Sequence, residues 1–514
     1  MAVKPKPRTI LEPIAESAVD SCNSPIKSLV LSKLSDEQTL IYVGTLSGAL
    51  LSYSIRHSQN APAEISFLNR ITIPGTGIGV NSIHPVVQIG KIIVHSDGFL
   101  FLLDSSLAEP AKRVGLFKGV TASCRRIRSR KYGSNLSNDG GSHTNHVDNG
   151  NSGSSSNLFA VGVGKKLVLA ELILSGSLVI MKDIQGFFDG IIITLLWVGD
   201  SIFVGTKIGY YLYNCVNGQC DLIFSLPDSS SVPRLKLLVR DLRVLLMVDN
   251  VGIIVDMVGQ PVEGSLVFKE APDSLSEIGN YVVAARDSAV ELYHRKTGCC
   301  VQRFTVSGDG NGGPCMLADE ENESGKLVLV ATSLKVFLLK LGIIFFSWHP
   351  FCSVLICYGK VSGEEQIKDL LRKKSFKEAI FLVEELDSEG EMTKEMLYFI
   401  HAQVGFLLLF DLHFKEAVDH FLLSENMQPS ELFPFIMRDP NRWTLLVPRN
   451  RYWGLHPPPT LLENVIDDGL TAIQRAAFLK KAGVEIAVDD EFLLNPPSRS
   501  DLLESAIENM IRYF

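Results

Sequence analysis

The chain has 514 residues, 46% of them hydrophobic, and a formal net charge of −8. This is roughly three times the length of a typical domain, and the apolar content can fill more than one core, so we expect a folded protein with several units. The 57 acidic residues outnumber the 49 basic ones, which argues against a protein that binds nucleic acid through its phosphates.

The first 340 residues read as β-strands. The opening residues, Met1 to Arg8, are followed by no long apolar segment, so neither a secretory signal nor a membrane anchor is expected there. Further on, short apolar runs turn on Gly, Asp, Asn or Ser and continue into a second apolar run, which is typical of β-hairpins. Seven of these hairpins recur at roughly 40 to 50 residues, the repeat length of propeller blades. The sequence therefore predicts an all-β, seven-bladed propeller over residues 1–340. The hairpins are 40–53, 92–103, 158–169, 202–213, 244–255, 282–293 and 328–339.

One insertion interrupts this spacing. Residues 129–157 are dominated by Gly, Ser and Asn, and we expect a disordered loop between strands of one blade. Directly before it, Cys124 is followed by five basic residues within seven positions, Arg125 to Lys131. These residues could meet acidic lipid headgroups or an acidic partner, but a solvated strand end is the favoured interpretation.

An apolar connector is predicted over residues 341–362. Its core, Leu341–Tyr358, is shorter than the roughly 20 apolar residues of a bilayer span and is interrupted by His349 and Pro350. A membrane helix is therefore disfavoured. The open alternatives are a buried strand with a connector that closes the propeller, or a splice-derived insertion.

A helical region, 363–514, follows. Ser362 and Ser375 each stand three residues before a Glu, the spacing of a capping box at a helix N-terminus. The motif Phe376–Ile380 (FKEAI) returns 38 residues later as Phe414–Val418 (FKEAV), and each copy opens an amphipathic helix. Repeats of this length are typical of stacked helical hairpins, so the sequence predicts the start of an α-solenoid. Further helical stretches are 392–410, 414–423, 461–482 and 500–514.

The last predicted helix ends the chain without a capping residue. We expect its apolar stripe to lack a neighbouring helix and its amides to exchange faster than those of the helix at Phe376. The stripe consists of Leu502, Leu503, Ala506, Met510 and Tyr513.

No catalytic, cofactor-binding or metal-binding residues are predicted, and no enzyme is expected. Gly308–Gly313 fits GxGxxG, but Pro314 follows and no helix begins there, so a hairpin loop is the better interpretation. Gly162–Lys166 lacks the spacing and the hydroxyl residue of a phosphate-binding loop. The nine cysteines include no CxxC pair, which favours reduced thiols. Possible metal ligands are scattered and form no four-ligand set. They are His143 and His146 in the insertion, Cys215 and Cys220 beside a hairpin turn, and the adjacent Cys299 and Cys300.

A family resemblance is carried mainly by the helical repeats. The predicted propeller followed by Glu364–Ile380 (EEQIKDLLRKKSFKEAI) and Phe406–Phe421 (FLLLFDLHFKEAVDHF) resembles vacuolar-sorting proteins that begin with a citron-homology (CNH) propeller. Within this family the chain is most similar to the vacuolar-sorting protein three and transforming-growth-factor-β-receptor-associated protein branch. Segments 435–443 and 449–459 are similar to plant members in particular.

The resemblance implies a non-enzymatic subunit of a CORVET-type endosomal tether, a complex related to HOPS. Such a subunit recognises a Rab GTPase on early endosomes, and we expect residues 1–340 to bind its GTP form. It also contacts other tether subunits and lies peripherally on endosomal or vacuolar membranes in the cytoplasm. There it supports vesicle docking and fusion in transport to the vacuole. No cofactor and no nucleic acid are implied.

Two features depart from the family pattern. The run Leu341–Tyr358 has no expected counterpart where a propeller joins a solenoid, and the family's long C-terminal solenoid is missing after Phe514. The second departure puts assembly into the complex in doubt. The alternative function is that of a different CNH-domain scaffold, one that regulates small-GTPase or kinase signalling.

Overall fold

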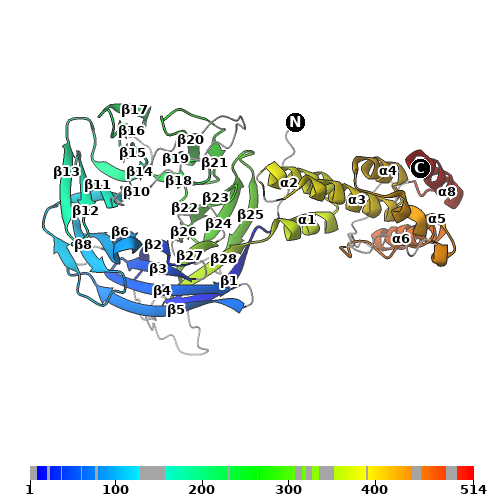
Figure 1. Cartoon of the computed structure of the whole chain (residues 1–514), viewed down its shortest axis with the longest axis horizontal. Coiled ribbons are helices and arrows are strands. Elements are labelled where there is room, and N and C mark those ends of the chain that lie inside the picture. The colour runs from blue at the N-terminus through cyan, green and yellow to red at the C-terminus, as the bar shows by residue number, and fades with distance from the viewer. Residues whose placement is uncertain are drawn as a thin grey trace, which may run out of the picture. The chain divides into compact units, whose positions relative to one another are not determined.

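The computed structural model shows two compact units, a β-unit over Thr9–Lys360 and a helical unit over Val361–Phe514 (Figure 1). The structure describes residues 8–19, 24–35, 38–58, 61–75, 79–127, 157–227, 232–262, 264–306, 315–319, 327–334, 352–388, 390, 392–442, 453–481, 492 and 495–514.

The described strands of the β-unit form six sheets, five of them four-stranded and one eight-stranded. One four-stranded sheet joins both ends of the unit and holds β26 (Met316–Asp319), β27 (Leu327–Leu334), β28 (Cys352–Lys360) and β1 (Leu11–Val19). Two more come from the N-terminal part: β2 (Ile26–Lys33), β3 (Gln38–Thr45), β4 (Ala49–Ser58) and β5 (Ala61–Thr72) form one, and β6 (Val80–Val86), β7 (Lys91–Ser96), β8 (Phe99–Asp104) and β9 (Lys112–Val114) form the other. The remaining two follow later in the chain: β18 (Leu235–Leu238), β19 (Arg243–Val248), β20 (Val251–Val255) and β21 (Leu266–Val267) form one, and β22 (Ser274–Ile278), β23 (Tyr281–Arg286), β24 (Ala289–His294) and β25 (Cys300–Thr305) form the other. The eight-stranded sheet holds β10 (Val120–Ile127), β11 (Asn157–Val163), β12 (Lys166–Leu172), β13 (Leu178–Ile184), β14 (Ile192–Val198), β15 (Ser201–Thr206), β16 (Gly209–Asn214) and β17 (Cys220–Ser225). A short 3-10 turn, η1 (Val87–Ile89), follows β6.

The sheets follow one another in a propeller-like ring (Figure 1). Consecutive sheets meet through strands such as β2 and β6, β14 and β18, and β22 and β26, and the sheet of β26, β27, β28 and β1 meets the β2–β5 sheet through β26 and β2. The ring is closed within one sheet, where β1 pairs antiparallel with β28 from Leu11 opposite Lys360 to Val19 opposite Ser353. Strands from opposite ends of the unit therefore complete a single sheet.

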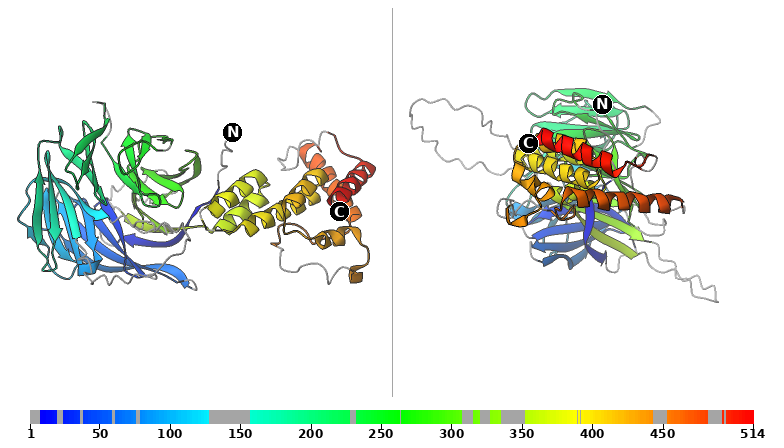
Figure 2. Two further views of the ribbon diagram at one scale, coloured as in Figure 1. Left: turned by 45° about the horizontal axis from the view of Figure 1, so that its top comes forward. Right: turned by 90° about the vertical axis from the view of Figure 1, so that its right-hand side faces the viewer.

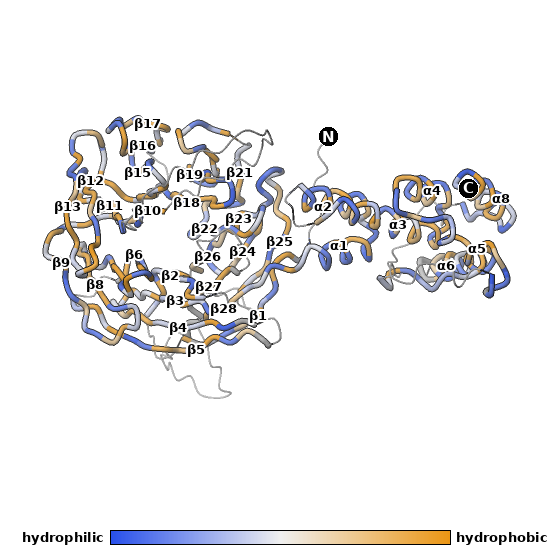
Figure 3. The backbone as a smooth tube through the Cα atoms, in the orientation of Figure 1, coloured by the Kyte–Doolittle hydropathy of each residue, from blue (hydrophilic) through white to orange (hydrophobic). Residues whose placement is uncertain are grey.

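The hydrophobic core of the β-unit is divided into clusters, most of which lie between neighbouring sheets and one of which lies between the two halves of the eight-stranded sheet. One cluster, for example, joins Ile41 and Tyr53 of the β2–β5 sheet to Leu329 and Leu355 of the closing sheet. The middle strands are buried along most of their length because neighbouring sheets cover both of their faces. Hydrophobic stretches consequently follow the strands and hydrophilic ones mark many turns (Figure 3).

The strands form where the sequence places apolar runs around tight turns. Between β7 and β8, Asp97 and Gly98 both have positive φ, 50° and 70°, as a two-residue type I′ turn requires. Six of the seven predicted hairpins are confirmed as paired strands, namely β3/β4, β7/β8, β11/β12, β15/β16, β19/β20 and β23/β24.

The prediction of seven blades is wrong. Two units that the hairpin spacing treats as separate blades form one eight-stranded sheet, because β10 pairs in parallel with β14. This pairing is short, Arg126 with Trp197 and Ile127 with Val198, and the Arg126 side chain reinforces it. Its Nε donates to the Gly199 carbonyl at 2.6 Å, and its guanidinium lies 5.7 Å from the Trp197 ring centroid. Hairpin spacing cannot reveal a two-residue contact between strands of different hairpins.

The region before the helices also differs from the prediction. In place of the seventh hairpin, β27 pairs with β28, and residues 335–339 lie outside the described residues. Residues 352–358, which the sequence analysis assigned to an apolar connector, belong to β28 and pair on both sides, with β27 and with β1. This part of the segment is thus the buried strand of the open alternatives. Residues 341–351 and residues 129–156 of the predicted disordered loop lie outside the described residues.

The helical unit consists of helices that pack in pairs (Figure 2). α1 contacts α2, α3 contacts α4, and α8 contacts both α4 and α6. The predicted helices are confirmed to within two residues at their ends, and the Ser362 hydroxyl accepts a hydrogen bond from the Glu365 N–H at 3.3 Å, as the capping-box spacing predicts. The elements are α1 (Gly363–Arg372), α2 (Phe376–Ser388), α3 (Lys394–Phe410), α4 (Phe414–Leu423), η2 (Pro429–Leu432), α5 (Phe433–Ile436), η3 (Pro440–Arg442), α6 (Leu462–Lys481) and α8 (Arg499–Tyr513).

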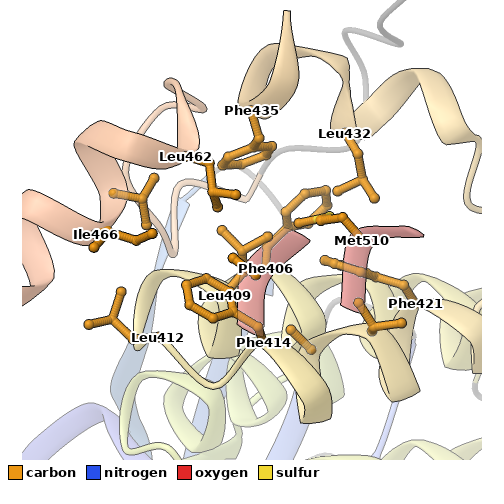
Figure 4. Packing of buried hydrophobic residues seen from close by; sticks show 14 of the residues in the cluster. Phe406, Leu409, Leu412, Phe414, Phe421, Leu432, Phe435, Leu462, Ile466 and Met510 are labelled. Atoms are coloured by element: carbon orange, nitrogen blue, oxygen red, sulfur yellow. The ribbon is translucent and has the colours of Figure 1, made fainter. Parts of the chain in front are cut away.

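The core of the helical unit gathers aromatic and aliphatic side chains from α3 to α8 (Figure 4). Phe406 and Phe421 lie 5.0 Å apart between ring centroids, edge to face. The α8 stripe is not left without a neighbour as we expected, because Leu502, Ala506 and Met510 are buried in this core. The relative exchange rates of α8 and α2 stay a prediction.

Candidate functional site

The FKEA repeat is preceded by the same turn in both copies. Lys374 and Leu412 adopt the left-handed conformation, with φ of 55° and 67°. After each, the next residue returns a hydrogen bond to the helix just ended, from Ser375 N–H to the Leu370 carbonyl and from His413 N–H to the Leu408 carbonyl, both at 2.9 Å. This is the Schellman arrangement of a helix C-terminus. The sequence repeat is therefore a repeat of turn geometry as well.

The two turns lie beside each other and beside α6. The Lys374 Nζ is 2.7 Å from a carboxylate oxygen of Asp411, which joins the α1–α2 turn to the α3–α4 turn. Leu412 packs on α6 at Gly469, where a Cβ would lie 2.7 Å from the nearest Leu412 atom. Glycine at this position allows α6 to approach the second turn closely.

A cavity of about 400 Å³ lies between these elements. Its apolar lining comes from Phe376, Leu408, Phe410 and Ile473, together with other residues of the two turns and α6. Among the described residues that line it, the charged ones are Lys374 and Asp411, which form an ion pair. This volume is in the range of small-ligand sites. The sequence pattern does not reveal the cavity, because the cavity depends on α6 meeting a turn about 60 residues away along the chain.

Two histidines meet between α3 and α4. The Nδ1 atoms of His401 and His420 are 2.9 Å apart, and the ring centroids are separated by 5.2 Å, so the nitrogens meet end to end. One Nδ1 must donate the hydrogen bond and the other must accept it, so the two rings differ in tautomer. Burial, followed by the charge of His420, lowers the pKa of His401 to about 4. Burial also lowers the pKa of His420, although Asp419 opposes the shift.

A second polar cluster joins neighbouring sheets of the β-unit. The Ser123 hydroxyl on β10 lies 3.0 Å from both the Ser82 hydroxyl and the His84 Nε2 of β6. Burial, with further contributions from His95 and Arg125, lowers the pKa of His84 to about 4. Such an imidazole is a weak base at neutral pH, and among the described residues no carboxylate orients it as in a Ser–His–Asp triad. The cluster is best explained as a hydrogen-bonded connection between β6 and β10.

The residues weighed as possible ligands form no metal-binding group within the described residues. Gly164 is in the turn between β11 and β12, with φ of 62°, so Gly162–Lys166 is a hairpin turn. Within the described part of the chain, no three His, Cys, Asp or Glu side chains are placed to hold a metal ion. The histidines of the insertion and Gly308–Gly313 lie outside the described residues.

The described part of the basic segment has structural contacts. Arg125 donates to the Pro85 carbonyl, and Arg126 forms a 2.8 Å ion pair with Asp200 besides its contact with Trp197. The favoured interpretation of a strand end is therefore supported for these two residues. Arg128 to Lys131 lie outside the described residues.

Among the described residues, no helix is both long enough and apolar enough to cross a bilayer.

Comparison with known proteins identifies one domain and one relative. The CNH domain family model matches residues 37–308, more than half of the chain. Vacuolar sorting protein 3 of Arabidopsis thaliana is 46% identical over 518 aligned residues, which cover 95% of this chain and 50% of the relative. This similarity confirms the resemblance drawn from the helical repeats. The chain spans about half the length of that relative.

Two solved structures align with the chain at 10% identity. The AfRom2 CNH domain gives a TM-score of 0.44 and covers 68% of this chain and 99% of its own. The WD40 domain of Neurospora crassa Pan2 gives 0.45 and covers 69% of this chain and 98% of its own.

Proposed function

The chain belongs to the CNH-domain family, and on that premise we propose that it acts without catalysis in vacuolar protein sorting, as part of a vesicle-tethering assembly. The observation that carries the proposal is the 46% identity to vacuolar sorting protein 3, which extends over 95% of the chain and thus over both units. Similarity limited to the CNH domain would support a propeller-like scaffold alone. Because it continues through the helical repeats, it supports the trafficking role.

We propose further that the tethering assembly is of CORVET or HOPS type and that the chain recognises an early-endosomal Rab GTPase in its GTP form. Peripheral association with endosomal or vacuolar membranes then follows from the membrane-bound GTPase and the other tether subunits. An exposed outer strand of the β-unit supports binding to partners. Along β13, residues 179–183 are all exposed, and three of them, Val179, Ile180 and Met181, are apolar. Exposed apolar residues on an edge strand are typical of protein-binding surfaces.

The test is retention of the 514-residue chain on immobilised early-endosomal Rab GTPase. We expect retention on the GTP-loaded form and at most weak retention on the GDP-loaded form, because tether recruitment requires discrimination between the two states. Equal retention on both forms, or on neither, contradicts the proposal.

The same assay distinguishes the alternative of a signalling scaffold. A Rho-family GTPase loaded with GTP serves as the competing bait. Retention on this bait in preference to the Rab GTPase would favour the alternative.

A further inference from the structure

The cavity between the repeated turns has one charged wall and one apolar wall. The described residues that α6 contributes to the lining are Gly469, Ala472 and Ile473, and these carry no charge. The opposite wall is formed by the two turns, which bring in the Lys374–Asp411 ion pair and the ring of Phe376. An occupant would therefore meet apolar surface on one side and charge on the other.

The surface of the α1–α2 turn beside the cavity is basic. Four of the six residues from Arg372 to Lys377 are Arg or Lys, and all four are exposed. Ion pairs of 2.7 Å join Lys373 to Asp369 and Lys374 to Asp411 and offset two of these charges, which leaves an excess of two positive charges on the turn. Such a surface attracts acidic groups and repels basic ones.

The apolar part is large enough for one bulky side chain. Phe376, Leu408, Phe410 and Ile473 line about 400 Å³, and burial of an aromatic or leucine side chain among them would remove a large apolar area from water. Ala472 is exposed at the rim, so the cavity is reachable from solvent.

We propose that this cavity binds a short acidic peptide segment of a partner protein, with one bulky apolar side chain in the cavity and its acidic residues against the 372–377 turn. The segment is held by a single anchor and by surface charge, which suits a weak and reversible contact. The proposal is independent of GTPase recognition, since the cavity lies within the helical unit.

The experiment measures fluorescence anisotropy of labelled ten-residue peptides added to the 514-residue chain. The probe has a central Trp flanked by Glu residues, and it is compared with a peptide in which Lys replaces every Glu and one in which Ala replaces Trp. We expect saturable binding of the acidic Trp peptide that weakens with added salt, and at least tenfold weaker binding of the other two.

Two matched pairs of variants locate the binding. Ala472→Phe fills the cavity from its rim and is expected to weaken binding about tenfold or more, whereas Gln474→Phe adds the same ring to an exposed position of α6 outside the cavity lining. Lys374→Gln removes the positive charge at the cavity and leaves the Asp411 carboxylate, and it is expected to weaken binding of the acidic peptide about threefold. Lys373→Gln breaks an ion pair of the same 2.7 Å length away from the lining and serves as its control.

Three outcomes overturn the proposal. They are no binding of any peptide at millimolar concentration, equal binding of the acidic and basic peptides, and equal effects of Ala472→Phe and Gln474→Phe. Self-association of the chain that Ala472→Phe abolishes would also contradict it, because a second copy would then be the occupant. Circular dichroism of each variant confirms folding, and unchanged GTPase retention separates this result from failure of the proposed function.

Discussion

The two units of this chain differ in how far apart along the sequence their contacting residues lie. In the β-unit, Leu11 pairs with Lys360, and core clusters such as the one that joins Ile41 to Leu329 lie between two sheets, so these sheets depend on their neighbours for burial. In the helical unit, α1 packs on α2 and α3 on α4, with one turn between the members of each pair. Long-range pairing makes the β-unit dependent on closure of its ring, whereas helical hairpins can form from adjacent residues.

The largest effect is expected from a charge placed in the closing sheet. Leu355 is fully buried in β28, opposite Ser17 of β1 and Ala331 of β27. Leu355→Asp leaves an unpaired buried carboxylate and should destabilise the β-unit by about 4 kcal/mol or more. Thermal unfolding followed by circular dichroism should show early loss of the β-signal while the helical signal persists. Ile14→Asp, at a position 38% exposed in the same sheet, is the control. Equal loss of both signals would contradict the separation of the two units.

A smaller effect is expected in the helical unit when the aromatic side chain of Phe421 is removed from its core. Phe421 is 1% exposed and packs on Phe406 and Tyr513. Phe421→Ala should cost about 3 to 5 kcal/mol in urea unfolding monitored at 222 nm, because it leaves a cavity among α3, α4 and α8. Phe478→Ala, where the ring is 73% exposed, should change stability by less than about 0.5 kcal/mol. A loss shared with the β-unit would show that the cores are coupled.

The third change tests how closely α3 and α4 approach. At Gly405 of α3, a Cβ would lie within the contact distance of the Phe421 ring, which is buried and has no room to move. Gly405→Ala should therefore destabilise the helical unit by about 1 to 3 kcal/mol, even though Ala favours helices. Gly115→Ala, with nothing within 4 Å of its Cβ, should be nearly neutral. A stabilising effect of Gly405→Ala would mean that α3 and α4 lie farther apart.

The smallest effect concerns pH. The pKa of His401 is about 4 in the folded chain and about 6.5 in an unfolded one. As the pH falls, His401 is therefore protonated in the unfolded chain before it is protonated in the folded chain. The contribution of the His401–His420 pair to the stability of the helical unit is therefore complete above pH 6.5 and is lost as the pH falls towards 4. His401→Gln should reduce this dependence when helical unfolding is measured between pH 7 and pH 4. His84 is shifted in the same direction in the β-unit, so the helical signal must be followed separately. An unchanged pH dependence in the variant would exclude a role for the pair.

Local patterns predicted local elements well and their assembly poorly. The spacing of apolar residues predicted the helix at Phe376 and the hairpin at Asp97, because each depends on residues close in sequence. It failed where distant strands meet, as in the two-residue pairing of β10 with β14, which merges two predicted blades. It also placed Cys352–Tyr358 in a connector, because a strand buried on both faces reads as a continuous apolar run.

The candidate site likewise combines a local feature that the sequence predicts with packing contacts that it does not. The FKEA repeat could be recognised from the sequence, and it marks one wall of the cavity at Phe376. The other wall at Gly469 and the contact of His401 with His420 depend on how helices pack across turns. A mid-helix glycine such as Gly469 or Gly405 was the available signal for close packing, although it does not identify the partner helix.

The most direct test of the account is a hydrogen-exchange footprint of GTP-loaded early-endosomal Rab GTPase on the 514-residue chain. We predict that the GTPase slows exchange in peptides from the β-unit, Thr9–Lys360, that peptides of the helical unit are unaffected, and that the GDP-loaded form gives no footprint. Protection confined to the helical unit, or the same protection with either nucleotide, would contradict the division of roles between the two units.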